Sequence, residues 1–333
     1  MKILKTILAV ALLSISCSKD NDNPQPQPET PKIATVYVGG SEVNAATLKN
    51  IPTIWKNGVA QQLPLSAGFE GEVKSIFIVG ETVYAAGYER LDNMLSTYRA
   101  VLWKNGLKTN LSTNSSTANG IFVTNGKTYI VGKENQMAIL WLDNTAQILA
   151  NGEDATGVFV KNNEIYISGK TVNGGGYWKS TSPQPNYLID SAGPSQARSI
   201  SLNDNNDVLI AGSAQNSSSV ISGRLWNSNA ISPEKFENGT VMRSVHTQGT
   251  NVYACGFTAS AGNVQATLWK NNQPTKLSQN KSNANSVFAT ATDTYVAGNE
   301  ENQEERACIW KNGSIQLLST LNSVALCVFV TEK

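Results

Sequence analysis

The sequence predicts an all-β fold, a seven-bladed β-propeller of four-stranded blades, over residues 33–333. Three observations predict it. A unit of roughly 40 to 45 residues recurs along the chain, which is the length of a propeller blade. Every unit carries one Trp, and the two ends of the chain hold complementary parts of a single unit. Only 15% of the residues are charged and 26 are Gly, a composition that favours many turns and an exported, β-rich protein.

Each unit holds four short strand patterns around its Trp. The second pattern ends in Gly, as in V-Y-A-A-G at 83–87, and a shorter pattern such as 75–78 precedes it. The Trp lies in the third pattern and is often followed by Asn-Gly, as at Asn105-Gly106, which favours a type I′ hairpin. The repeated residues are Trp55, Trp103, Trp141, Trp178, Trp226, Trp269 and Trp310.

The chain ends predict that the propeller closes on itself. The first unit begins with its second strand, at Ala34, and the last residues form a spare first strand, at 326–330. Pairing between 326–330 and 34–40 completes the first blade from both ends of the chain. It also removes two open β-edges, which would otherwise invite aggregation.

The repeated Trp is interpreted as packing between blades, because both faces of the middle strands need apolar cover. The alternative is a ladder of aromatic side chains that stack on sugars. The residue three positions before each Trp is small or Pro, which indicates close approach of a neighbouring strand. These residues are Pro52, Ala100, Ala138, Gly175, Gly223, Ala266 and Ala307.

The N-terminus predicts export. Lys2 and Lys5 precede an apolar run at 7–15, so residues 1–16 are interpreted as a signal peptide, too short to cross a bilayer as a helix. Residues 17–32 are polar and rich in Pro, and we expect a tether without a core of its own.

The end of the signal, Leu13-Ser14-Ile15-Ser16-Cys17, resembles the lipobox of bacterial lipoproteins, although Leu lies four rather than three positions before the Cys. The resemblance implies cleavage before Cys17, acylation of Cys17 and a membrane anchor. Residues 18–22, Ser-Lys-Asp-Asn-Asp, resemble the signal that sends lipoproteins of the Bacteroidota to the outer membrane or cell surface. An ordinary signal peptide followed by a chance Cys is the alternative, and periplasmic and surface-facing orientations both stay open.

The repeat itself resembles a known one. Residues 100–106, A-V-L-W-K-N-G, followed by Leu111, Gly126 and I-V-G at 130–132, are similar to the bacterial extracellular HAF-type repeat. The likeness covers residues 34–330 and departs from the family where Phe would follow Ala. It implies a propeller, and it brings no activity and no active-site residues. Kelch repeats are a weaker likeness, through the double Gly at 39–40 alone.

Several function classes find no support in the sequence. After removal of the leader, 24 basic and 25 acidic residues remain, so no basic field attracts nucleic acid. The one His, His246, occupies a position where other units carry Phe, and no cofactor or metal site is predicted. Asp204 and Asp207 lack the Gly and distal Glu of a calcium loop.

Three cysteines follow the leader region, and we expect them to be small buried residues. A disulfide between two of them stays open, because pairing cannot be deduced from sequence. They are Cys255, Cys308 and Cys327.

Two further groups of charged residues lie on predicted loops and turns. Carboxylates on predicted loops are candidates for glycosidic chemistry, and nothing distinguishes them from solvated acids: Glu89, Asp92, Glu134 and Glu300. Lys follows Trp in five units and forms a predicted ring of turn residues on one face: Lys56, Lys104, Lys179, Lys270 and Lys311.

The candidate ligand face is the one that carries the loops between second and third strands. These loops vary most in length, at 41–51, 88–98, 213–221, 257–264 and 299–306. The aromatic and Arg side chains predicted there are Tyr88, Arg90, Tyr98, Arg99, Phe257 and Arg306. The sequence favours a non-catalytic, lipid-anchored envelope or surface protein that binds a protein or glycan through this face. A glycan hydrolase or lyase, and a structural envelope-assembly component, are the alternatives.

Overall fold

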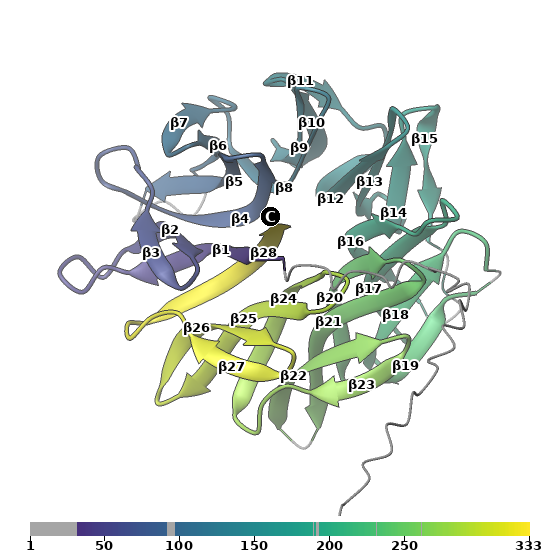
Figure 1. Cartoon of the computed structure of the whole chain (residues 1–333). Coiled ribbons are helices and arrows are strands. Elements are labelled where there is room, and N and C mark those ends of the chain that lie inside the picture. Colours follow the sequence, from purple (N-terminus) through teal and green to yellow (C-terminus); the bar gives the residue numbers. More distant parts are fainter. Residues whose placement is uncertain (1–31, 92–96, 189, 191–192, 231, 261) are drawn as a thin grey trace, which may run out of the picture. The chain divides into compact units, whose positions relative to one another are not determined.

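The computed structural model describes residues 32–91, 97–188, 190, 193–230, 232–260 and 262–333. Within it, Ala34–Lys333 forms one compact unit of seven four-stranded antiparallel sheets (Figure 1). The sheets are the blades of a propeller ring, so the predicted seven-bladed fold is confirmed. The predicted signal peptide, Cys17 and all but the last residue of the predicted tether lie outside the described residues.

The blades follow one another along the chain, and each is built from first to fourth strand. The first three blades comprise β28 (Ser323–Glu332), β1 (Ala34–Val43), β2 (Asn50–Lys56) and β3 (Val59–Gln62); β4 (Phe69–Val79), β5 (Thr82–Leu91), β6 (Tyr98–Lys104) and β7 (Leu107–Asn110); β8 (Ser116–Thr124), β9 (Lys127–Glu134), β10 (Met137–Leu142) and β11 (Thr145–Ile148). The fourth and fifth comprise β12 (Gly152–Lys161), β13 (Glu164–Thr171), β14 (Gly174–Lys179) and β15 (Ser182–Tyr187); β16 (Ser195–Leu202), β17 (Val208–Gln215), β18 (Ile221–Asn227) and β19 (Glu234–Asn238). The last two comprise β20 (Thr240–Gln248), β21 (Asn251–Ser260), β22 (Asn263–Lys270) and β23 (Gln273–Lys276); β24 (Lys281–Ala289), β25 (Thr294–Asn302), β26 (Glu304–Lys311) and β27 (Ser314–Leu317).

The two ends of the chain share the first blade, as predicted. Strand β28 pairs antiparallel with β1 from Ala34, opposite Glu332, to Glu42, opposite Ser323. The last strand of the chain thereby supplies the first strand of a blade whose other three strands come from residues 34–62. Both ends must therefore be in place before the ring is complete.

The Asn-Gly turns between third and fourth strands have the predicted geometry. Asn105 has φ of 49° and Gly106 has φ of 79°, so both central residues are left-handed, as a type I′ turn requires. The Asn105 side chain also accepts a hydrogen bond of 2.8 Å from the backbone N–H of Val83, at the start of the second strand. The turn residue therefore fixes two strands of its blade.

All seven repeated Trp side chains are buried, and the most exposed, Trp226, shows 6% of its surface. None of these rings is available to a ligand at the surface.

The residue three positions before each Trp marks a contact between blades, as the sequence indicated. The backbone N–H of Ala100, for example, donates to Ser116 Oγ of the next blade at 3.0 Å.

The second strand was predicted to end at the repeat Gly, and this prediction is wrong. Strand β5 runs on from Gly87 to Leu91, and β25 runs on from Gly298 to Asn302. The polar residues beyond Gly continue the ladder with the third strand, where Arg90 pairs with Tyr98. Residues 88–91, 257–260, 263–264, 299–302 and 304–306, which the sequence placed in loops, are therefore paired strand.

The repeat Gly faces a β-bulge in the first strand of its blade. Val73 lies opposite Gly87 and Ser75 lies opposite Ala86, so Lys74 is left between them as the extra residue. At the bulge the chain comes so close that a Cβ on Gly87 would lie 1.9 Å from the Glu72 carbonyl oxygen. The same contact, at 1.9 to 2.1 Å, recurs at Gly40, Gly132, Gly169, Gly212, Gly256 and Gly298.

The seven bulges are structurally equivalent, and each leaves one residue outside the regular pairing of its first strand. These residues are Lys74, Asn119, Thr156, Arg198, Arg243, Asn285 and Leu326.

The contact predicts an unusual order of sensitivity among the glycines. Gly132→Ala should destabilise the protein by about 3 kcal/mol or more, because its Cβ would overlap the Thr117 carbonyl and force the bulge apart. Gly126→Ala should cost only about 1 to 2 kcal/mol, although Gly126 has φ of 73°, because its turn leaves open space for a Cβ. Urea unfolding of both variants tests this order, and an equal loss in the two would contradict the bulge contact.

Candidate functional site

The bulge residues line a cavity in the central channel of the ring. We call this cavity the channel cup; Lys74, Asn119, Thr156, Arg198, Arg243, Asn285 and Leu326 line its mouth, a space of about 310 Å³. A deeper space of about 270 Å³ shares this lining and adds the small residue that follows each bulge, such as Ser75 and Ser199. The cup thus takes one side chain from every blade.

A ring of aromatic side chains lies three residues beyond the bulges. We call it the aromatic collar; it comprises Phe77, Phe122, Phe159, His246, Phe288 and Phe329. Neighbouring ring centroids in the collar are 4.5 to 5.2 Å apart. The seventh equivalent position is Ser201, which lies within hydrogen-bond distance of Thr247 Oγ1 at 3.2 Å. The collar therefore separates the polar cup from the turns that join first and second strands.

His246 lies in the aromatic collar, at the position where most other blades carry Phe, as the repeat predicted. Its ring stacks on Phe288 at 4.5 Å and 29°, and its Nε2 lies 3.2 Å from the Ala289 carbonyl oxygen. Burial lowers the pKa of His246 to about 4, against an ordinary value of 6.5. The imidazole is therefore neutral near pH 7 and belongs to the packing of the collar.

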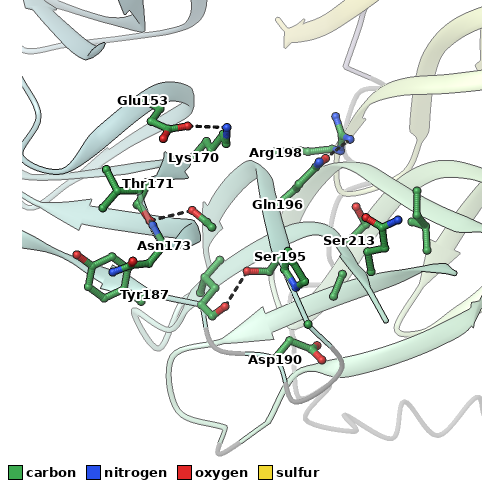
Figure 2. A pocket seen from close by; sticks show the side chains of 18 of the residues that line it. Glu153, Lys170, Thr171, Asn173, Tyr187, Asp190, Ser195, Gln196, Arg198 and Ser213 are labelled. Carbon is green, nitrogen blue, oxygen red and sulfur yellow. Dashed lines mark hydrogen bonds and ion pairs between the residues drawn. The ribbon is translucent and has the colours of Figure 1, made fainter. Parts of the chain in front are cut away.

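A cavity larger than the channel cup lies between two blades, away from the axis. We call it the interblade pocket; it lies between β12–β15 and β16–β19 and measures about 890 Å³ (Figure 2). It opens at the strand ends where second strands pass to third strands, on the face where the sequence placed the candidate ligand face. Polar lining groups include Thr171, Asn173, Gln196, Ser213 and Gln215.

Exposed apolar side chains accompany these polar groups. Val172 is 59% exposed, Tyr187 is 39% exposed and Ile221 is 42% exposed, and all three line the interblade pocket. The pocket therefore offers an aromatic ring and aliphatic contacts together with hydrogen-bonding side chains, the usual mixture of a ligand site.

The two carboxylates of the pocket are held in ion pairs. Glu153 Oε2 lies 2.5 Å from Lys170 Nζ at the exposed margin, and the hydrogen bond from Lys170 raises the pKa of that ammonium. Asp190 pairs with Arg224, which is 2% exposed and also donates to Ser222 Oγ at 2.7 Å. Each carboxylate of the pocket therefore lies beside a cation.

A run of three glycines explains why the pocket forms here. Gly174, Gly175 and Gly176 open β14, and a Cβ on Gly175 would lie 3.0 Å from Ser195 Oγ of the next blade. Ser195 accepts the Gly175 N–H at 3.2 Å and donates to the Leu188 carbonyl at 2.8 Å. The absence of side chains at these three positions lets the two blades meet beside the pocket and leaves its space open.

Four of the six predicted ligand-face residues come together on one blade. Tyr88 and Tyr98 pack edge to face at 5.0 Å, and Arg90 donates to Tyr98 Oη at 2.9 Å. Arg90 also pairs with Glu70 at 2.6 Å, and Arg99 lies over the Phe69 ring at 4.8 Å. Their strand positions make them a packed cluster and not the loop tips that the sequence indicated.

The other two predicted residues lie on different blades. Phe257, on β21, lies beneath the guanidinium of Arg243 at 5.3 Å, next to the channel cup. Arg306, on β26, approaches Glu304 at 3.4 Å. A ligand role for the six residues stays a prediction.

The four carboxylates that the sequence offered for glycosidic chemistry are dispersed, and Glu89, Glu134 and Glu300 lie in strands instead of loops. Glu89 in β5 is fully buried; burial alone would raise the pKa of its carboxyl, but hydrogen bonds from Lys108 and Ser66 hold that pKa below its usual range. Glu300 in β25 accepts a hydrogen bond from Ser278, Glu134 accepts one from Asn114 at 2.5 Å, and Asp92 lies outside the described residues.

The five Lys that follow Trp each lie over a Tyr of the adjacent strand. Lys104 Nζ, for instance, is 5.2 Å from the Tyr84 ring, and the equivalent pairs are Lys56–Tyr37, Lys179–Tyr166, Lys270–Tyr253 and Lys311–Tyr295. These contacts fix the ring of Lys to its blades by cation–π attraction.

The cysteines and the turn that carries Asp204 and Asp207 can also be placed. Cys255, Cys308 and Cys327 are free and buried, and burial raises the pKa of Cys327 to about 12. Asp207 accepts from Asn203 Nδ2 at 2.8 Å and thereby fixes its turn. Within the described part of the chain, no cluster of three His, Cys, Asp or Glu residues has metal-site geometry.

Sequence reasoning missed both the channel cup and the interblade pocket. The cup residues had a signal, since each stands directly before the small residue of its first strand, as Arg198 does before Ser199 and Arg243 before Ser244. The only sequence signal of the pocket was the Gly run at 174–176.

Comparison with known proteins identifies no family for the chain. No protein-family model and no curated protein matches it. Among solved structures, TolB from Acinetobacter baumannii has 10% identity and a TM-score of 0.47, over 88% of this chain and 82% of that one. A structure assigned as TolB from Agrobacterium tumefaciens has 9% identity and a TM-score of 0.47, over 68% and 94%. A structure assigned as a 6-phosphogluconolactonase from Bacteroides fragilis has 10% identity and a TM-score of 0.44, over 90% and 98%. Similarities this low carry nothing about activity or partners.

The buried His246 predicts a pH-dependent stability. The pKa of about 4 in the folded state lies below the unfolded value, so the unfolded chain takes up the proton first as the pH falls. Stability is therefore present above about pH 6.5 and is lost as the pH falls toward 4, by about 2 kcal/mol between pH 7.5 and 5. His246→Phe, which restores the aromatic residue of the other units, should remove this loss. Urea unfolding at the two pH values measures it, and an unchanged pH dependence in the variant would contradict the assignment.

Proposed function

We propose that the chain is a non-catalytic, lipid-anchored protein of the outer membrane or cell surface that binds a protein or glycan partner through the face on which the interblade pocket opens. The observation that carries the binding role is the pocket of about 890 Å³, with its polar lining and its exposed Val172, Tyr187 and Ile221. The anchor rests on the lipobox-like residues before Cys17.

The state of the pocket's carboxylates favours binding over hydrolysis. Glycoside hydrolysis requires one carboxyl group that stays protonated near neutral pH and a second that acts as base or nucleophile. Here Glu153 and Asp190 each face a cation, Lys170 and Arg224. Each of these carboxylates is therefore engaged by a cation, an arrangement that supports ligand binding more than hydrolysis.

The chemistry of the lining favours a glycan as the partner. Sugar hydroxyls both donate and accept hydrogen bonds, and the amides of Asn173, Gln196 and Gln215 offer both kinds of group. The exposed Tyr187 ring supplies a flat apolar surface beside them. A protein partner that inserts side chains into the same pocket is the alternative outcome.

A retention experiment tests the proposed binding. Residues 33–333 are immobilised and incubated with native envelope and growth-medium extracts, and the retained glycans and proteins are identified. The test variant carries Asn173→Ala and Tyr187→Ala, and the control carries Asn110→Ala and Leu107→Ala on the exposed fourth strand of another blade. We expect the wild type and the control to retain an intact glycan and the pocket variant to lose at least about tenfold, since it lacks hydrogen bonds and ring contact.

Other results would revise the proposal in defined ways. Recovery of a cleaved glycan would show that the protein is a glycan hydrolase or lyase and not a non-catalytic binding protein. A stoichiometric protein lost only from the pocket variant would make the partner a protein, and one retained by all three forms would indicate an assembly component that uses another surface.

The anchor has its own test. In cells that express the full chain, Cys17→Ser should move the protein from the membrane fraction to the soluble fraction and abolish labelling by a fatty acid analogue, because the acyl chains provide the hydrophobic anchor. Ser18→Ala, at the adjacent position, should leave both unchanged. Continued membrane partition and labelling of the Cys17→Ser protein would exclude this anchor.

A further inference from the structure

The channel cup collects positive charge without matching carboxylates. Among the described residues that line it are Lys74, Arg198 and Arg243, and no Asp or Glu. Lys74 Nζ has a partner nearby, since it lies 3.1 Å from Glu72 Oε2. Arg198 and Arg243 make no ion pair with any described residue.

The two guanidinium groups repel each other in a confined space. Water reaches Arg198, which is exposed, but the walls of the cup surround its head group. Desolvation, and then the charge of Arg243, lower the pKa of Arg198. Desolvation also lowers the pKa of Arg243, against weaker opposing contributions from Cys255 and Glu305. Arg stays charged at neutral pH even when its pKa is lowered. The repulsion and the desolvation therefore remain as an unfavourable free energy, which a bound anion would offset.

Both guanidinium groups are held in place with donors to spare. Arg243 lies over the Phe257 ring and donates from Nη1 to Asn285 Oδ1 at 2.5 Å. Arg198 donates from Nη2 to Gln196 Oε1 at 2.6 Å. Each guanidinium carries five N–H groups, so most of its donors remain for a ligand in the fork geometry that matches an oxyanion.

The floor of the cup adds hydroxyl groups. The residues after four of the bulges are Ser75, Ser199, Ser244 and Ser286, and each of these hydroxyl oxygens accepts a backbone N–H of the next blade at 3.2 to 3.3 Å. A hydroxyl that accepts in this way still has its own hydrogen to donate. The hydrogen bonds found among the described residues use these four hydroxyls as acceptors, so their hydrogens remain as donors in the space that Arg198 and Arg243 also line.

We propose that the channel cup is a binding site for an oxyanionic group, a carboxylate, sulfate or phosphate, held between Arg198 and Arg243 above the serine hydroxyls. A space of about 270 to 310 Å³ admits one such group with a short stem. The evidence for this site comes from residues outside the interblade pocket, apart from Arg198, which borders both cavities, and its partner Gln196, which lines the pocket.

Titration calorimetry on residues 33–333 tests the site at fixed ionic strength with chloride as the reference anion. The probes are sodium acetate and sodium glucuronate as carboxylates, and sodium sulfate and inorganic phosphate as tetrahedral oxyanions. We expect saturable binding of one equivalent, weakened about tenfold or more by Arg198→Gln and by Arg243→Gln, because each removes charge-assisted hydrogen bonds. The melting temperature of Arg198→Gln without anion should not fall, because the substitution removes one of two like charges.

A matched control separates a built site from a general charge effect. Lys127→Gln with Lys235→Gln removes two exposed cations that do not line the cup and should leave the affinity unchanged. Tighter binding of the carboxylate probes would identify the ligand as a carboxylic acid, and tighter binding of the tetrahedral probes would identify a sulfate or phosphate ester. Absence of saturable binding to every probe, or an equal loss of affinity in the Lys control and the Arg variants, would overturn the proposal.

Discussion

In each blade one Gly lies against a carbonyl oxygen of the first strand, and this contact is possible only because no Cβ intervenes. The contact accompanies a bulge that places one extra residue in the first strand. Since the extra residue takes no part in the regular pairing, its side chain is free of the constraints that fix its neighbours. Seven repetitions of this geometry give the ring seven side chains around its axis, and all of them line the channel cup.

The residue after the bulge links each blade to the next. Where it is Ser, as at Ser199 and Ser244, its oxygen accepts a backbone N–H of the following first strand. Where it is Gly, as at Gly157, the blades approach instead, and a Cβ would lie 3.3 Å from the Ile200 nitrogen. Both solutions hold neighbouring first strands together near the axis. The buried Trp residues do the same farther out, so the cup is lined by side chains on a rigid support.

The sequence predicted the fold well because its signals are local. Trp103, Asn105 and Gly106 specify a buried strand and a tight turn within four residues, and repetition of such signals determines the number of blades. The same local signals could not show how far a second strand continues beyond its Gly. Glu89 and Arg90 have the composition of a loop, but they pair within a ladder, and Glu89 is buried because Lys108 neutralises it.

The candidate ligand residues are aromatic and Arg side chains, because these suit recognition. None of the six lines the channel cup, but two of them contact cations that do. Tyr88 lies beneath Lys74 at 5.6 Å, and Phe257 lies beneath Arg243 at 5.3 Å, so two of the six chosen residues support cup cations. When the seven units are aligned on the small residue that follows the bulge, Lys74, Arg198 and Arg243 stand in one column. The other members of that column are Asn119, Thr156, Asn285 and Leu326.

That column contains charged, polar and apolar residues, whereas the Gly opposite it does not vary from blade to blade. The contrast has a physical cause, because a substitution at the bulge changes a side chain that faces the channel, while a substitution at Gly forces the backbone apart. The chemistry of the cup can therefore change one residue at a time without loss of the fold. The present set, with two unpaired guanidinium groups above four hydroxyls, is thus a property of the site and not a requirement of the propeller.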